Sequence, residues 1–271
     1  MRHQRAKGKQ ARRSQWYGAI GQYYDTLWDG IPRIWTEARR RLLDPILPQV
    51  RQVCELGCGT GTSSIEFARG GLKVFALDYS DEMCRITREK AREEGLDVWV
   101  GRADMRSFRL PQQVDLVTSE WGVINHLPRR AELGRTFRAV ARALRPGGYF
   151  YFDLHQRRFY EDVFSQTVIA DKVNAGNGRE FFAAQRGGFD RSRDIGWTEI
   201  TLFVCGSGGR WERRRERIEE IYWPHGEIVR HLRRAGFHLL YAFDFVNPDT
   251  PRPKKPHQGL RTMYLAVKKG A

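Results

Sequence analysis

A glycine-rich turn after a short apolar stretch constrains this chain most. The segment reads Val53-Cys54-Glu55-Leu56-Gly57-Cys58-Gly59-Thr60-Gly61, with a strand expected over residues 50–56 and a helix over 62–69. Alternate glycines let the backbone adopt positive φ and let a ligand approach with no Cβ in the way. The free N–H groups at the start of the helix point toward that ligand. This order predicts a nucleotide-type pocket at the carboxyl end of a sheet.

The spacing of the glycines argues against one class of cofactor. Dinucleotide-binding folds use G-x-G-x-x-G, in which the third glycine permits close packing of helix and strand. Here the spacing is G-x-G-x-G, preceded by Glu55. A nicotinamide oxidoreductase is therefore a distant alternative.

Strands alternate with helices along most of the chain. Beyond the glycine turn we expect strands over 72–77, 97–101, 114–120, 149–154, 237–245 and 260–268, and helices over 80–94, from Pro128 to about 144, and over 224–235. An acid at the end of the second strand, Asp78, faces the ribose position of such a pocket. The alternation predicts an α/β fold with a parallel sheet.

The pattern changes between residues 156 and 223. A short helix is expected over 156–165, followed by alternating segments over 167–173, 180–185, 196–205 and 210–222, with turn signals at 176–178, 187–188 and 206–209. Together they predict an antiparallel meander inserted after the fifth strand.

We therefore expect five parts along the chain. They are a disordered basic tail over 1–14, a helical arm over 15–48, an α/β core over 49–155, the antiparallel insertion over 156–223, and the closing part of the core over 224–271. The arm carries a cluster of aromatic residues that begins at Trp16. It either covers the glycine pocket as a lid or simply packs its rings on the sheet.

The formal charge of +15 is concentrated at the two ends of the chain. Residues 1–24 and 250–271 each carry six lysines and arginines and no acid, so residues 25–249 carry only +3. A basic tail can bind nucleic acid or a membrane surface without sequence specificity. The low charge of the rest favours a solvated tail instead. Nucleic acid thus remains possible as a partner, but it is not favoured.

No feature points to a membrane, a secretory signal or a metal. No apolar run approaches the roughly 20 residues of a membrane helix, and the N-terminus lacks an apolar segment after its basic residues. The four cysteines, at 54, 58, 84 and 205, form no C-x-x-C pair and no zinc spacing. We expect reduced thiols in a cytoplasmic protein without a metal.

One internal run is also basic. Arg210, Arg213, Arg214, Arg215 and Arg217 lie close together, but glutamates at 212, 216, 219 and 220 are interleaved with them. This mixture favours a solvated pair of strands over an RNA-binding patch.

Five segments, in this order along the chain, resemble the motifs of one protein family. They are Glu55 to Gly61, Leu77-Asp78-Tyr79-Ser80, Ala103-Asp104-Met105, Val114-Asp115-Leu116-Val117 and Leu144-Arg-Pro-Gly-Gly148. Together they resemble class I S-adenosylmethionine (SAM)-dependent methyltransferases, above all the small-molecule branch of glycine and sugar-amine N-methyltransferases. The resemblance covers about residues 50–155 well and 224–268 in pattern. It implies SAM as cofactor and a Rossmann-like, mostly parallel sheet of seven strands with helices on both faces and an antiparallel last strand.

The resemblance also implies contacts to SAM. It places the backbone of Gly57, Gly59 and Gly61 along the methionine part, Glu55 near the amino group, Asp78 on the ribose, Tyr79 and Met83 beside the adenine, Asp104 and Met105 at the adenine edge, and Glu120 toward the sulfonium. An arginine at a similar place to Arg33 pairs with the SAM carboxylate in glycine N-methyltransferases. An ordinary solvated charge is the alternative for Arg33.

The chemistry of methyl transfer needs few reactive side chains. The methyl group on a sulfonium is already activated, so the enzyme mainly orients two partners. An amine reacts in its neutral form, so one mild proton acceptor is enough, and the candidates are Glu120, His126 and His155. A purely structural hydrogen bond is the alternative for each histidine. The sequence Ser119-Glu120-Trp121-Gly122 differs from the motif with which base-amine methyltransferases bind a flipped base.

The predicted function is methyl transfer from SAM to nitrogen or oxygen of a small molecule. A methyltransferase that grips RNA or protein with its basic termini is the first alternative. A SAM-binding module without turnover is the second. The sequence predicts neither the acceptor nor the oligomeric state.

Overall fold

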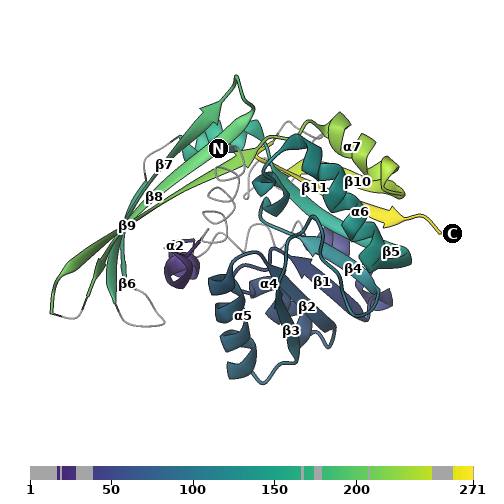
Figure 1. Cartoon of the computed structure of the whole chain (residues 1–271), viewed down its shortest axis with the longest axis horizontal. Coiled ribbons are helices and arrows are strands. Elements are labelled where there is room, and N and C mark those ends of the chain that lie inside the picture. Colours follow the sequence, from purple (N-terminus) through teal and green to yellow (C-terminus); the bar gives the residue numbers. More distant parts are fainter. Residues whose placement is uncertain are drawn as a thin grey trace, which may run out of the picture.

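The computed structural model describes residues 17–18, 20–28, 39–165, 168–173, 179–206, 208–245 and 259–270, with the backbone alone for 168–173 and 245. The predicted basic tail and Arg33 lie outside these residues. Two sheets form the framework of the described part (Figure 1).

The larger sheet has seven strands in the order β10-β11-β5-β4-β1-β2-β3. Its strands are β1 (Gln52–Leu56), β2 (Lys73–Asp78), β3 (Val98–Arg102), β4 (Val114–Ser119), β5 (Leu144–His155), β10 (Phe237–Phe245) and β11 (Arg261–Lys268). Strands β1 to β5 pair in parallel, and β11 lies antiparallel between β5 and β10. The predicted Rossmann-like, mostly parallel sheet with an antiparallel last strand is confirmed.

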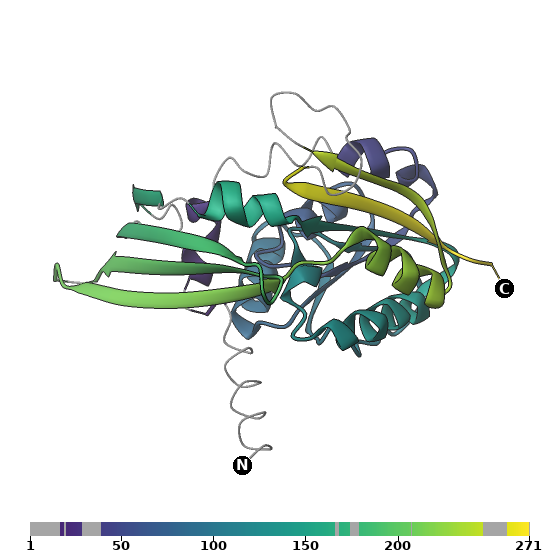
Figure 2. The ribbon, with the colours of Figure 1, turned by 90° about the horizontal axis from the view of Figure 1, so that it is seen from above.

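Helices cover both faces of this sheet (Figure 2). One face packs against α6 (Leu133–Ala143) and α7 (His225–Arg234), the other against α4 (Thr62–Arg69), with α5 (Asp81–Glu93) beside α4. The side chains of β5 point alternately to the two faces of the sheet and pack in the hydrophobic core on each face. Phe150 and Phe152 face Phe137 of α6, whereas Tyr151 faces Phe67 of α4 and Met263.

The topology places the glycine turn at a favourable point of the sheet. Strand β1 has β2 on one side and β4 on the other. The chain order therefore reverses there, and the crevice outside the carboxyl ends of these strands is where open α/β sheets bind ligands. Ser80 caps the next helix as its sequence predicts, since its Oγ accepts a hydrogen bond from the backbone N–H of Met83 at 3.4 Å.

The smaller sheet is the predicted insertion after β5. Its four antiparallel strands are β6 (Val168–Val173), β7 (Glu180–Asp190), β8 (Ile195–Cys205) and β9 (Trp211–Ile221), in chain order across the sheet. The π-helix η5 (Phe159–Phe164) links it to β5. One face packs on the arm segments η1 (Gly21–Tyr23) and α2 (Tyr24–Leu27), where Ile20 and Tyr23 join Phe181, Ile200 and Leu202 (Figure 1).

Two details of the sequence prediction are wrong. Gly187 and Gly188 do not form a turn, because β7 continues through them to Asp190. A Cβ on Gly187 would lie 2.6 Å from the carbonyl oxygen of Trp197 and 2.8 Å from that of Phe164. Gly187 therefore allows η5 to approach the sheet closely and does not reverse the direction of the chain.

The second wrong detail is the helix expected from Pro128. A 3₁₀ turn, η3 (Val123–His126), precedes Pro128, a second one, η4 (Arg130–Glu132), follows it, and α6 begins only at Leu133. Arg130 is held by Glu227 at 2.7 Å, Asp194 at 3.1 Å and the carbonyl of Tyr222 at 3.1 Å. These contacts to the insertion and α7 favour a tight turn at this position over a continuous helix.

A substitution at Gly196 is expected to destabilise the junction between the insertion and the core. A Cβ at this position would lie 2.2 Å from the ring of the fully buried Tyr160. Gly196→Ala should therefore lower the free energy of unfolding by about 1–3 kcal/mol, as overpacked core positions do. Urea denaturation measures the change. Gly226→Ala is the control, because nothing lies within 4 Å of the added Cβ in α7, and equal unfolding midpoints for both variants would contradict the expectation.

Candidate active site

The glycine turn forms an open cradle at the carboxyl end of β1. Gly57, Gly59 and Gly61 all have positive φ, at 73°, 54° and 86°. A Cβ on Gly57 would lie 2.5 Å from Val123, and one on Gly61 would lie 2.7 Å from Thr87, so these two glycines are required by packing. Gly59 has nothing within 4 Å of its Cβ position. The middle of the turn therefore faces space in which a ligand can lie against the backbone.

Asp78 connects this cradle with the second strand. Its Oδ2 accepts a hydrogen bond from the N–H of Gly59 at 2.9 Å, and its Oδ1 accepts one from the N–H of Ser80 at 2.8 Å. Each oxygen keeps a further lone pair for a ligand hydroxyl. Burial raises the pKa of Asp78, although the backbone N–H groups oppose the shift. Tyr79 lies next to it, with the Arg102 guanidinium 5.7 Å from its ring centre.

The predicted adenine edge lies after β3. Asp104 accepts hydrogen bonds from the Nε of Arg106 at 2.8 and 3.0 Å and from its backbone N–H at 2.9 Å. Burial alone would raise the pKa of Asp104, but these hydrogen bonds outweigh it and lower the pKa. Asp104 is thus an ionised acceptor. Met83 is buried in α5, and Met105 packs partly buried against the core.

A buried arginine from the arm enters the site at the other end of the cradle. Arg39, which is 6% exposed, donates a hydrogen bond to Ser63 Oγ at 3.1 Å and contacts Glu66. Its Nη1 lies 3.6 Å from Glu120 Oε2 at the end of β4. The sequence prediction named Arg33, which lies outside the described residues, and did not name Arg39. A signal was present, because Arg39 precedes the buried Leu42 and Leu43 by three and four residues and so shares their helix face.

Two buried carboxylates lie beside this arginine. Glu55 accepts a hydrogen bond from Ser64 Oγ, and Glu120 Oε2 accepts one from Ser63 Oγ at 3.3 Å. Burial, and then the charge of Glu120, raise the pKa of Glu55 to about 8. Burial raises the pKa of Glu120 to about 7 against the opposing charge of Arg39. Among the described residues, Glu120 Oε1 has no hydrogen-bond partner, so this end of the cradle can still accept a cationic donor.

A second polar cluster lies where the insertion meets η3 and β5. Glu220 of β9 places its Oε1 3.5 Å from His126 Nε2 and 3.3 Å from His155 Nδ1. The Tyr17 hydroxyl of the arm lies 3.2 Å from the same His126 Nε2. The side chains of Glu220 and His126 are only 5% and 13% exposed. The arm, the core and the insertion therefore meet at His126.

The sequence prediction missed Glu220 and Tyr17. Glu216, Ile218 and Glu220 occupy every second position of β9 and are all buried on one face. The alternation of side chains along a strand could have placed Glu220 on the same face as the apolar Ile218. Burial raises the pKa of Glu220, although His126 opposes the shift. No local pattern marks Tyr17, because its contact with His126 joins residues that are 109 positions apart.

The two histidines differ in what they can do. Arg261 Nη2 lies 2.9 Å from His155 Nε2. A guanidinium only donates, so His155 Nε2 accepts and the ring proton lies on Nδ1, toward Glu220. Burial, and then Arg261, hold the pKa of His155 well below its usual range. His155 is therefore neutral with its lone pair engaged, whereas the Nε2 of His126 contacts the Tyr17 hydroxyl and the Glu220 carboxylate.

The turn after β4 is held in a strained conformation between the two clusters. Trp121 has φ of 67°, which is uncommon for a residue other than glycine. Asp153 accepts hydrogen bonds from the N–H of Trp121 at 3.0 Å and of Gly122 at 2.7 Å. Arg261 lies 3.6 Å from Asp153 and 4.7 Å from the centre of the Trp121 ring. These contacts fix the backbone between Glu120 and His126.

The arm also contacts the cradle directly. Asp25 accepts a hydrogen bond from Thr60 Oγ1 at 2.6 Å, and Thr60 is buried within the glycine turn. In the part of the chain that the structure describes, no group of three histidines, cysteines or carboxylates is placed to hold a metal ion. No described helix is long and apolar enough to cross a membrane.

Comparisons with known proteins agree with this geometry. A family model described as a methyltransferase domain matches residues 53–148. The chain is 27% identical over 225 residues to YqeM of Bacillus subtilis, with 82% of this chain and 87% of that protein covered. It is 30% identical over 221 residues to carboxy-S-adenosyl-L-methionine synthase of Campylobacter jejuni, with 77% and 79% covered.

A solved structure extends the agreement to the whole fold. The sugar N-methyltransferase KedS8 from Streptoalloteichus superposes with a TM-score of 0.70 at 23% identity, over 91% of this chain and 92% of that one. The family match, the relatives and the shared fold confirm the resemblance read from the sequence. The chain belongs to the class I SAM-dependent methyltransferases.

Proposed function

We propose that this SAM-dependent methyltransferase methylates a nitrogen or oxygen atom of a small-molecule acceptor. The enclosure of the His126 cluster carries the proposal. His126, His155 and Glu220 are almost fully buried between the arm, the insertion and the core. A small molecule fits such a setting better than a folded macromolecule does. The sugar N-methyltransferase KedS8 has the same fold and is consistent with this class of acceptor.

The residues around the glycine turn fit SAM. The open cradle at Gly59 leaves room for its methionine part. Glu120 Oε1, which no described residue hydrogen-bonds, supplies an acceptor there. In this proposal Arg39 binds the carboxylate, Glu55 and Glu120 face the ammonium, and Asp78 accepts from the ribose hydroxyls. Asp104, Tyr79, Met83 and Met105 surround the adenine. When bound, SAM supplies a methyl group that its sulfonium has already activated.

The chain's own contribution to the reaction is orientation and proton transfer. We assign the proton acceptor for the nucleophile to His126, because His155 already uses its lone pair for Arg261. Glu220 and Tyr17 then orient the imidazole of His126 and stabilise its protonated form. Glu120 belongs to the cofactor side of this arrangement, since its Oε2 contacts Ser63 and Arg39. The strained turn at Trp121 keeps the two sides at a fixed separation.

The raised pKa of Glu55 predicts how SAM affinity depends on pH. Its pKa is about 8, so at pH 6 the carboxyl must lose its proton before it can pair with the ammonium. Affinity should rise by up to about tenfold per pH unit from pH 6 toward 8, and it should fall again where the amino group of SAM loses its own proton, near 8. Calorimetry in two buffers of different ionisation enthalpy should show proton release at pH 7.

The Glu55→Gln variant should bind SAM weakly and with a flatter pH profile. Glu89→Gln, which removes an exposed carboxylate of α5, is the control and should keep the wild-type profile. A wild-type affinity that stays constant between pH 6 and 8 would contradict the role of Glu55.

Transfer of a labelled methyl group tests the proposed acceptor. SAM with a labelled methyl group is incubated with the full chain and, separately, with the small-molecule and macromolecular fractions of a lysate. We expect label in the small-molecule fraction, and mass spectrometry of the product then identifies the methylated atom. Label only in RNA or protein contradicts the small-molecule proposal.

A further inference from the structure

The basic run of β9 is sorted by the strand into two different faces. Arg213, Arg215 and Arg217 alternate with Glu216 and Ile218, so the arginines share one side of the sheet. Glu216 and Glu220 turn to the other side, where Glu216 accepts a hydrogen bond from the N–H of Tyr17. Arg214 shares the side of these glutamates and Glu219 shares the side of the three arginines, so the strand separates the interleaved charges only in part.

We call the side with these arginines the outer face. From the register of the three strands it comprises Phe182, Ala184 and Arg186 of β7, Trp197, Glu199, Thr201 and Phe203 of β8, and Trp211, Arg213, Arg215, Arg217 and Glu219 of β9. The opposite side packs on the arm, and its Glu220 contacts His126. A ligand on the outer face is thus separated from the His126 cluster by the thickness of the sheet.

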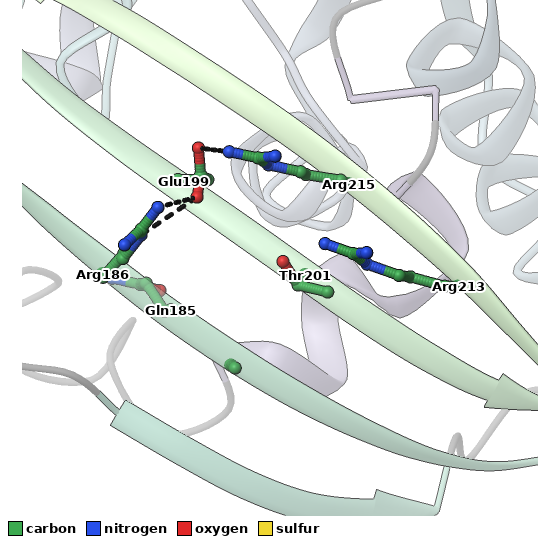
Figure 3. A pocket seen from close by; sticks show the side chains of 7 residues that line it. Gln185, Arg186, Glu199, Thr201, Arg213 and Arg215 are labelled. Atoms are coloured by element: carbon green, nitrogen blue, oxygen red, sulfur yellow. Dashed lines mark hydrogen bonds and ion pairs between the residues drawn. The ribbon is translucent and has the colours of Figure 1, made fainter.

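The outer face contains a hollow of about 240 Å³ with an excess of positive charge (Figure 3). Glu199 lies between two arginines, contacting Arg186 at 2.8 Å and also Arg215. Arg213 lies beside Thr201 and, among the described residues, forms no ion pair. Three arginines against one glutamate leave a surplus of two positive charges in the hollow. Guanidinium groups and a hydroxyl are the donors that phosphate oxygens accept from best.

Aromatic residues lie beside this hollow on the same face of the sheet. Trp211 is 50% exposed at the start of β9. Phe182 and Phe203 are half-buried neighbours with ring centres 6.5 Å apart, and the Arg217 guanidinium lies 4.5 Å from the centre of the Trp197 ring. Exposed rings and guanidinium planes stack with bases, and only unpaired bases offer their faces.

We propose that the outer face of the antiparallel sheet binds single-stranded nucleic acid, with a phosphate in the hollow at Arg213 and bases on the neighbouring rings. A second copy of the chain is the competing occupant. In a twofold dimer through this face, however, the positively charged hollows of the two copies would face each other, and their repulsion disfavours association. The proposal concerns the face opposite the His126 cluster, so it stands independently of the methyl acceptor.

Fluorescence anisotropy with a labelled single-stranded RNA of about 16 nucleotides tests the proposal on the full chain. Arg213→Gln should weaken binding at least fivefold and reduce the slope of log affinity against log salt by about 0.7. Arg92→Gln is the matched control, because it removes an exposed arginine from helix α5, which packs against the larger sheet. The basic termini are present in both variants, so the difference between them reports on the outer face alone.

Trp211→Ala separates stacking from charge. It should weaken binding of the same RNA while the salt slope stays that of the wild type. A duplex of the same sequence should bind more weakly than the single strand. Equal effects of Arg213→Gln and Arg92→Gln would overturn the proposal. So would a dimer that Arg213→Gln dissociates, measured by sedimentation, while RNA binding is unchanged.

Discussion

Replacing Asp78 by asparagine should weaken SAM binding by about 100-fold. The variant loses the charge that accepts from the ribose hydroxyls in our proposal, and each charge-assisted hydrogen bond contributes about 1.5–3 kcal/mol. It also places an amide against the N–H groups of Gly59 and Ser80, which now donate to a carboxylate. Isothermal titration calorimetry with SAM measures the loss.

Asp81→Asn is the control for this experiment. Asp81 lies three residues further on, is exposed, and pairs with Arg102 on the surface. This variant should bind SAM as the wild type does. An Asp78→Asn variant whose affinity stays within about threefold of the control would contradict the assigned ribose contact. Circular dichroism of each variant confirms that the fold is retained.

Replacing His126 by asparagine should lower the rate of methyl transfer by about 100- to 10,000-fold, the range that one general base contributes. SAM affinity should be unchanged, because His126 lies on the acceptor side, next to Tyr17 and Glu220. The measurement is the initial rate of label transfer to the acceptor found in the small-molecule fraction. Glu220→Gln should cause a smaller loss and shift the pH profile of the rate to lower pH, because the imidazolium loses its stabilising carboxylate.

His238→Asn removes an exposed histidine from β10 and is the matched control. A His126→Asn variant with wild-type turnover would reduce His126 to a structural role. Loss of SAM binding in the same variant would instead place His126 on the cofactor side and contradict the division of the site.

The α/β framework was predictable because its signals are local. The apolar strands, the glycine turn and the Ser80 cap each depend on residues that are close in sequence. The positions at which prediction failed depend on distant contacts. Gly187 looks like a turn residue until Trp197 and Phe164 lie against it, and Pro128 looks like a helix start until Arg130 is held by Asp194 and Glu227.

Most residues of the proposed cofactor side, and His126 and His155 on the acceptor side, could be named from the sequence. Glu55, the three glycines, Asp78 and Glu120 lie at the carboxyl ends of β1, β2 and β4, which are neighbours in the sheet, so the order of strands brings them together. Arg39, Tyr17 and Glu220 come from the arm and the insertion. Their positions follow from how those parts fold back over the core, which no spacing along the chain encodes.

The division of the site into a cofactor side and an acceptor side is the central claim, and a crystal structure with S-adenosylhomocysteine tests it most directly. We expect the ribose on Asp78, the carboxylate on Arg39, and the sulfur directed toward His126. A ligand whose sulfur faces away from His126, or whose carboxylate does not reach Arg39, would contradict the account.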